Sequence, residues 1–216
     1  MTTIKICGIT RAEDAEVAVS LGVHALGFVL WPDSPRAIAL SDASTIVRRL
    51  PPIVVSVAVF VDPTLDEAAR AVDEGFSVVQ VHGRAPAWHD IQQAVPRAIR
   101  AVRLSDNGAG IVPSVGDETT VLLDAHDPIR HGGSGQVIDW TRAAAIASRR
   151  RVILAGGLTP ANVGDAIRVV QPYGVDVASG VEERPGIKSP AALRAFVAAV
   201  RRTDVLEGTP LGVPGE

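Results

Sequence analysis

A single cysteine at the end of a short β-branched run is the residue in this sequence whose type and position first indicate chemistry. Residues 4–7, Ile-Lys-Ile-Cys, read as a buried strand, and Cys7 is the one cysteine among 216 residues. A thiolate is a nucleophile and a base, whereas a buried thiol is by default a small hydrophobic side chain. The role of Cys7 therefore depends on the groups that neighbouring strands place beside it.

Polar residues fall on one parity in four of the predicted strands. Side chains alternate between the two faces of a strand, and we assign the apolar parity to the face that meets helices. Lys5 and Cys7 then point to the opposite, inner face, as do four residues from later strands: Gln80, His82, Asp124 and Asp176. Buried charges are costly unless paired, so Lys5 is expected either to form a structural ion pair with one of the two aspartates or to serve the chemistry.

Eight strand-like segments alternate with Ala-rich helical segments along the chain. The strands are predicted at 4–7, 25–30, 54–61, 77–82, 98–104, 119–124, 151–154 and 174–178. The helices are predicted at 12–20, 41–49, 64–73, 86–95, 140–148, 161–170 and 191–201. Asn-Gly-Ala-Gly and Pro-Ser-Val-Gly between 105 and 118 are loop signals, so the fifth helix is predicted to be short or missing.

This alternation predicts one α/β domain over residues 1–202, a (βα)8 TIM barrel whose parallel strands are joined by right-handed crossovers. An open doubly wound sheet is the competing arrangement, and the strand count favours the barrel. Barrel active sites lie at the C-terminal ends of the strands, which is where Cys7, His82 and Asp124 are expected. Residues 203–216 have no periodic pattern and are predicted to form a disordered tail.

The composition argues against several classes of function. Hydrophobic residues make up 47% of the chain, the formal net charge is −3 and no basic stripe is present, so we expect no nucleic-acid partner. The sequence shows neither an apolar run long enough to span a membrane nor the apolar stretch of a signal peptide. One cysteine cannot form an intramolecular disulfide, so the cytoplasm is the expected location.

Two glycine-rich loops follow the seventh and eighth predicted strands. The first, at 155–160, contains Gly156 and Gly157, and it ends in Thr159 and Pro160, which are expected to be the N-cap and first residue of the next helix. The second, at 178–182, contains Ser179 and Gly180. Glycines can serve tight turns alone, but barrel phosphate sites are often built from these two loops. The pair therefore favours a phosphorylated ligand.

Two further loops carry candidate residues. Arg36 follows the second strand, where an arginine is usually solvated or paired on the surface but can also grip a substrate carboxylate with two hydrogen bonds. The segment 131–135, His-Gly-Gly-Ser-Gly, is typical of a mobile lid, and Asp139 is expected to cap the helix that starts at Trp140.

These segments together resemble the phosphoribosylanthranilate isomerase family of tryptophan biosynthesis. The similarity spans residues 3 to about 201 and rests on short blocks in family order: Lys-Ile-Cys-Gly-Ile-Thr at 5–10, Gly-Phe-Val at 27–29, Ser-Pro-Arg at 34–36, Val-Gln-Val-His-Gly at 79–83, Leu-Leu-Asp at 122–124, Gly-Gly-Ser-Gly at 132–135, Asp-Trp at 139–140, Gly-Gly-Leu-Thr-Pro-Ala-Asn-Val at 156–163, Val-Asp-Val-Ala-Ser-Gly-Val-Glu at 175–182 and Pro-Gly-Ile-Lys at 185–188. The first and last blocks are specific, whereas the glycine pairs alone are not.

The resemblance implies an Amadori rearrangement of N-(5-phosphoribosyl)anthranilate. In the family, the general base matches Cys7, the general acid matches Asp124, and the anthranilate-binding arginine matches Arg36. The family's phosphate site matches the loops around Gly156, Gly157, Ser179 and Gly180. This chemistry needs no cofactor and no metal.

Three inward-facing residues are expected to contact the substrate: Gln80, His82 and Asp176. Ring opening requires a proton donor, and removal of a proton from C2 of the sugar requires a base such as a thiolate. Lys5 lies two residues before Cys7 on the same face, and we hypothesise that its charge helps to hold Cys7 as the thiolate.

Several other functions are compatible with parts of the pattern. A metal-using epimerase would need more His and Asp ligands than His82 and Asp124 provide. An indole-glycerol-phosphate synthase would have no obvious use for Cys7, and the related isomerase of histidine biosynthesis typically uses paired aspartates. A non-catalytic barrel that binds a phosphorylated ligand would keep both glycine loops without needing Cys7 and Asp124 together. We expect a monomer rather than a dimer.

Overall fold

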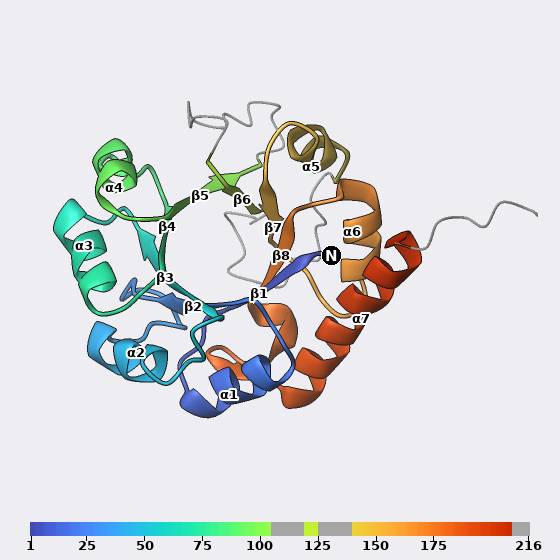
Figure 1. The fold of residues 1–216 in the computed structure, drawn as a ribbon, viewed down its shortest axis with the longest axis horizontal. Coiled ribbons are helices and arrows are strands. Elements are labelled where there is room, and N and C mark those ends of the chain that lie inside the picture. Colours follow the sequence, from blue (N-terminus) through green and yellow to red (C-terminus); the bar gives the residue numbers. More distant parts are fainter. Residues whose placement is uncertain (105–118, 125–139, 209–216) are drawn as a thin grey trace, which may run out of the picture.

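The computed structural model describes residues 1–104, 119–124 and 140–208 and shows the predicted closed barrel of eight parallel strands. Figure 1 looks down the barrel, with the strands forming a ring and the helices lying outside it. The barrel strands are β1 (Thr3–Cys7), β2 (Ala25–Val29), β3 (Val55–Val61), β4 (Val78–His82), β5 (Ala98–Arg103), β6 (Val121–Asp124), β7 (Val152–Leu154) and β8 (Gly174–Val177).

The described helices lie close to their predicted positions. They are α1 (Ala12–Ser20), α2 (Leu40–Val47), α3 (Leu65–Asp73), α4 (Trp88–Ala94), α5 (Trp140–Ala147), α6 (Val163–Val170) and α7 (Pro190–Gly208). The start of α3 shows how local sequence sets a boundary, because Thr64 and Glu67 form a capping box in which each side chain accepts a hydrogen bond from the other residue's backbone N–H. The segment 105–118, where the fifth helix was expected to be short or missing, lies outside the described residues, as do the predicted lid at 131–135 and Asp139.

Pairing of the first strand with the last closes the barrel. In the parallel ladder between β1 and β8, Lys5 is the register partner of Asp176. In the ladder between β1 and β2, Cys7 is the register partner of Gly27. Closure therefore places a lysine next to an aspartate and the cysteine next to a residue without a side chain.

The two faces of the strands pack into separate apolar clusters, as the alternation predicts. Ile4 and Ile6 belong to the large cluster between barrel and helices, together with outward residues of the later strands: Val79, Val81, Leu123, Val175 and Val177. Cys7 packs with the inner cluster, whose other buried members are Ala25, Val57, Val59 and Val78. The parity assigned to Cys7 from sequence is therefore confirmed.

At two helix ends the structure shows why the boundary differs from the prediction. Helix α6 begins at Val163 rather than Ala161, and its N-cap is Asn162 rather than Thr159. The reason is a turn before the helix, in which the Asn162 side chain accepts a hydrogen bond from the Thr159 backbone N–H at 2.7 Å and donates one to the Gly157 carbonyl at 3.0 Å.

The last helix is longer than predicted. Helix α7 runs to Gly208, so residues 203–208 of the expected tail are helical, and the rest of that tail lies outside the described residues. Tertiary contacts hold the extension: Thr203 is buried, and Asp204 accepts hydrogen bonds from the backbone N–H and hydroxyl of Thr2 at 2.9 and 2.6 Å. These partners lie at the other end of the sequence, where no local pattern reveals them.

A small hairpin after β8 was not predicted. A short 3₁₀ turn at Ser179–Val181 leads into β9 (Glu182–Arg184), which pairs antiparallel with β10 (Ile187–Lys188). The tight connection contains Gly186 at φ +79°, a left-handed conformation that favours glycine. The Pro-Gly pair at 185–186 was the available signal, since this dipeptide commonly marks a turn.

Candidate active site

The side chains of Cys7 and Lys5 both lie close to Gly27 on the inner face of the barrel. A Cβ atom at Gly27 would lie 2.9 Å from the Cys7 Sγ and 3.0 Å from the Lys5 Nζ. Both side chains are almost fully buried, at 7% and 2% exposed. The missing side chain of Gly27 therefore creates the space that the thiol and the ammonium share.

Lys5 forms its ion pair with Asp176 and not with Asp124. The Lys5 Nζ donates a hydrogen bond to the Asp176 Oδ1 at 2.8 Å, as the register across β1 and β8 requires. Burial alone would lower the pKa of Lys5, but Asp176 and Cys7 outweigh it and hold that pKa above its usual value. Lys5 is therefore charged. It forms a structural ion pair with Asp176, and its charge also lowers the pKa of the Cys7 thiol.

Burial and two nearby cations have opposite effects on the pKa of the Cys7 thiol. Burial raises the pKa of Cys7, and Asp176 raises it further, whereas Lys5 and Lys188 lower it. The raising effects are larger, so the pKa of Cys7 lies above its ordinary value. The expectation that Lys5 favours the thiolate agrees in direction with its contribution, but Lys5 alone does not offset burial.

Lys188 is a buried cation beside Cys7 that the sequence analysis did not single out. Its Nζ donates hydrogen bonds to the Cys7 carbonyl at 2.6 Å, the Ala178 carbonyl at 3.1 Å and the Glu182 Oε1 at 2.8 Å. Lys188 is 1% exposed, and burial lowers its pKa against the opposing effect of Glu182. The side chain thus ties the hairpin to the end of β1.

Arg36 is paired within the protein, and the pair leaves part of the guanidinium available. Its Nε and Nη2 donate to the two carboxylate oxygens of Glu182 at distances between 2.7 and 3.1 Å. The Arg36 Nη1 donates no hydrogen bond to any of the described residues. Gly8, at φ +76°, lets the Arg36 side chain cross the backbone, because a Cβ there would lie 2.6 Å from the Arg36 Cδ. Glu182 therefore fixes the direction of the guanidinium.

Gln80 and His82 lie on the inner face of β4 as predicted. The Gln80 Nε2 donates a hydrogen bond to the His82 Nε2 at 2.7 Å, because an amide nitrogen cannot accept one. Gln80 is buried, and its Oε1 has no hydrogen-bond partner within the described part of the chain. A buried acceptor without a donor is costly, so Gln80 offers a bound molecule a ready hydrogen-bond acceptor.

Asp124 ends β6 on the inner face and is half-buried. Leu122, two residues earlier, packs in an inner cluster, which confirms the parity assigned to this strand. The register partner of Asp124 on β5 is Arg103, whose strand neighbour Ala101 also packs inside. Arg103 therefore lies at the same end of the barrel as Asp124. Applying the alternation of strand faces to β5 in the sequence would have identified Arg103 as an inward-facing residue.

The two glycine loops contact one another. Gly156 and Gly157 both have positive φ, at +85° and +66°. A Cβ at Gly180 would lie only 1.9 Å from the Leu158 carbonyl oxygen, so the loop after β8 lies directly against the loop after β7. Ser179 is exposed beside this contact. The backbone of both loops is thus gathered in one place, as an anion site between them would require.

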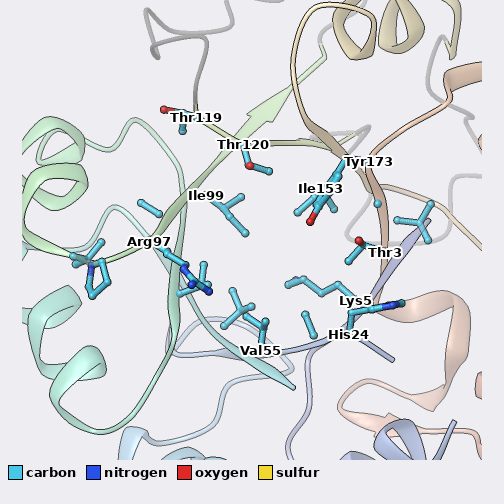
Figure 2. Close-up of a pocket in the computed structure, with 18 of the residues that line it drawn as sticks. Thr3, Lys5, His24, Val55, Arg97, Ile99, Thr119, Thr120, Ile153 and Tyr173 are labelled. Carbon is cyan, nitrogen blue, oxygen red and sulfur yellow. The ribbon is translucent and has the colours of Figure 1, made fainter. Parts of the chain in front are cut away.

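A separate cavity of about 610 Å³ occupies the opposite, N-terminal mouth of the barrel. Figure 2 shows residues from the strand beginnings around it, including Thr3, Val55 and Thr120, with Lys5 on its wall. It contains neither Cys7 nor Asp124. Among the described residues, no group of three or more His, Cys, Asp or Glu side chains is arranged to hold a metal ion, and no helix is both long and apolar enough for a membrane span.

The fold and the gathering of charged groups at the C-terminal strand ends define a (βα)8-barrel enzyme, and the comparisons with known proteins agree. A model of the family described as N-(5'-phosphoribosyl)anthranilate (PRA) isomerase matches residues 4–199. The N-(5'-phosphoribosyl)anthranilate isomerase of Citrifermentans bemidjiense is 43% identical, covering 94% of this chain and 98% of its own. The chain therefore belongs to the phosphoribosylanthranilate isomerase family.

Solved structures of the family have the same architecture. The phosphoribosyl anthranilate isomerase from Thermotoga maritima superposes with a TM-score of 0.86 at 38% identity, over 94% of this chain and 100% of that one. A second structure, at TM-score 0.82 and 35% identity over 94% and 100% of the two chains, is a complex with reduced 1-(o-carboxyphenylamino)-1-deoxyribulose 5-phosphate.

Proposed function

We propose that the protein converts N-(5'-phosphoribosyl)anthranilate to 1-(2-carboxyphenylamino)-1-deoxyribulose 5-phosphate in tryptophan biosynthesis. The observation that carries the proposal is the arrangement of Cys7, Lys5 and Gly27 at the C-terminal mouth of a barrel of this family. The solved complex of a family member with a reduced product analogue supports the substrate class. The reaction takes place in the domain predicted over residues 1–202, with the cytoplasm as its location.

Asp124 acts as the general acid in the first step. Its carboxylic acid form donates a proton to the ring oxygen of the ribofuranose, the bond from that oxygen to the anomeric carbon breaks, and the nitrogen lone pair forms the iminium ion. The half-buried position of Asp124 at the end of β6 suits a group that must touch the substrate. Asp124 is then the carboxylate, and the proton that Cys7 takes from C2 in the second step is returned to it through solvent before the next turnover.

Cys7 acts as the general base in the second step. Its thiolate removes the proton from C2 of the iminium ion, and the electron pair moves to give the enolamine, which tautomerises to the ketone. Lys5 and Lys188 lower the pKa of Cys7 and so favour this thiolate at the C-terminal end of the barrel.

The remaining predicted residues bind the substrate. Arg36, aimed by Glu182, receives the anthranilate carboxylate on its open edge, and Gln80 and His82 receive the sugar hydroxyls. The loops that contain Gly156, Gly157, Ser179 and Gly180 receive the phosphate through their backbone N–H groups. Asp176 contributes by holding Lys5 in place beside the reacting carbon.

The test is an assay of the purified protein with N-(5'-phosphoribosyl)anthranilate made in situ, with the product identified by chromatography. Turnover by the wild-type protein is expected, and its absence would overturn the proposal. A barrel that only binds a phosphorylated ligand would retain product-analogue binding without turnover. The expected monomeric state is checked on the same preparation by sedimentation.

A further inference from the structure

Five charged side chains near Cys7 form a cluster of two groups, the Lys5–Asp176 pair and a triad in which Lys188 and Arg36 share Glu182. Lys5 contacts Asp176 at 2.8 Å, Lys188 contacts Glu182 at 2.8 Å, and Arg36 contacts Glu182 at 2.7 Å. The cluster thus holds three cations and two carboxylates. Within the described part of the chain, one positive charge of this cluster has no carboxylate to balance it, and a thiolate at Cys7 would supply that anion.

The unbalanced charge lies on the hairpin side of the cluster. Lys5 and Asp176 neutralise one another, so their fields at Cys7 oppose each other. Glu182, by contrast, is a single carboxylate shared between Lys188 and Arg36. Lys188 lies against the end of β1, since its Nζ is 2.6 Å from the Cys7 carbonyl oxygen, and its charge acts on the thiol.

The other groups packed against this point do not change the balance. Asp14 accepts a hydrogen bond from the Lys188 backbone N–H, but its carboxylate is already paired with Arg11 at 2.6 Å. Strand β2 contributes Gly27 beside the thiol, and it contains no titratable residue. Among the described residues, the electrostatic field at Cys7 is therefore set by the Lys5–Asp176 pair and by the two cations that share Glu182.

We propose that Lys188 is a positioning residue for the reaction, whose charge favours the thiolate form of Cys7 and whose link through Glu182 joins the base to Arg36. The proposal rests on the function proposed above, because it assigns a purpose to the thiolate. It extends that function by placing control of the base in the hairpin after β8. The single carboxylate of Glu182 then sets two properties at once, the direction of the Arg36 guanidinium and the charge felt by the thiol.

The test is a titration of Cys7 that needs no substrate. The chain contains one cysteine, so the ultraviolet absorbance of the thiolate, with the Cys7→Ser protein as the blank, reports this thiol alone. A charge within about 4–6 Å of a titrating group shifts its titration by about 1–3 pH units. We expect Lys188→Met to shift the Cys7 titration upward and Glu182→Gln to shift it downward.

Shifts in opposite directions distinguish this role from a structural one. Loss of packing or of a hydrogen bond in the hairpin would move both variants the same way, and that result, or no shift in either, would overturn the proposal. Lys188→Arg, which keeps the charge, is expected to titrate close to the wild type. If Lys188→Met does not fold, the downward shift of Glu182→Gln supports the proposal, and its absence overturns it.

Kinetics provide the second readout. Lys188→Met is expected to lower kcat about tenfold near neutral pH, to regain activity as the pH rises, and to leave KM within about twofold, because the substrate contacts remain. A higher KM at unchanged kcat would contradict the proposal. If the wild-type protein shows no isomerisation, the proposed function fails, whereas the titration still decides whether Lys188 controls the thiol.

Discussion

The two mouths of the barrel are built from the same eight strands, yet they hold different kinds of residue. At the C-terminal mouth, the thiol of Cys7 lies among ion pairs and close backbone contacts. At the N-terminal mouth, a cavity of about 610 Å³ is lined mainly by Val, Ile, Ala and Thr side chains and contains no comparable ion-pair cluster among the described residues. The difference indicates that the C-terminal end is the one organised for chemistry. Substitutions at the two ends should therefore have very different effects on the rate.

The largest loss is expected from Asp124→Asn at the C-terminal mouth. The amide cannot donate the proton that opens the ring, so kcat should fall by a factor of about 10² to 10⁴. Steady-state kinetics measure the effect, and a thermal unfolding curve close to that of the wild type serves as the control. Full activity would remove Asp124 from the mechanism and leave the fold unaffected.

Gly27→Ala tests whether the close approach of Cys7 and Lys5 at the C-terminal mouth matters for the rate. The new methyl group would lie about 3 Å from both the Cys7 Sγ and the Lys5 Nζ, so it must separate them. Displacement of a reacting group by about 1 Å can cost about 10² in rate, and a fall of that order in kcat is expected. The control is Ala98→Val, at the wall of the other cavity and outside the cluster that contains Cys7, which should keep kcat within about threefold.

Arg36→Lys tests the proposed contact between Arg36 and the anthranilate carboxylate of the substrate. Lysine keeps the charge but loses the planar fork that Glu182 orients, so KM is expected to rise about tenfold with little change in kcat. Measuring KM for the substrate and the dissociation constant of a product analogue in parallel checks both values. An unchanged KM would mean that the carboxylate binds elsewhere.

The pH dependence of stability follows from Glu182. Burial opposes its charge, but Arg36 and Lys188 hold the pKa of Glu182 below its ordinary value. A carboxylate with a lowered pKa stabilises the fold above its unfolded value of about 4.3, and this stabilisation is lost as the pH falls toward the lower folded value. Thermal unfolding of Glu182→Gln should show a lower Tm at neutral pH and a smaller further loss in acid than the wild type. Parallel acid profiles would contradict this assignment.

The smallest effect is expected at the N-terminal mouth. Thr120→Val removes a hydroxyl group from the cavity wall without changing the side-chain shape. Because no reacting group lies there, kcat and KM should both stay within about twofold of the wild-type values. A larger change in kcat would show that the two mouths are coupled.

The inner face of the strands could be predicted from the sequence because alternation is a local property. It placed Lys5 and Cys7 side by side, and Ile4 and Ile6 on the opposite face, without knowledge of any partner. The closed barrel followed from eight regularly spaced strands. Helix ends that depend on distant contacts, such as Thr2 with Asp204, could not be found in this way.

The hairpin is the part of the site that the sequence did not reveal. Lys188 binds the Cys7 carbonyl across 181 positions of sequence, and Glu182 reaches Arg36 across 146. Contacts of this kind depend on how the loops fold over the barrel mouth, and neither periodicity nor spacing encodes them. The same limit applied to Lys5, for which two aspartates were equally good partners until the register across β1 and β8 selected Asp176.

The most direct test of the account is removal of the C2 proton by Cys7. Single-turnover reactions would compare substrate carrying hydrogen or deuterium at C2 in the wild-type and Cys7→Ser proteins. The account predicts that deuterium slows the wild-type reaction and that Cys7→Ser is slower by a factor of about 10² to 10⁴, because a serine hydroxyl is far too weak an acid to ionise near neutral pH. A folded Cys7→Ser protein that turns over within about tenfold of the wild-type rate would contradict it.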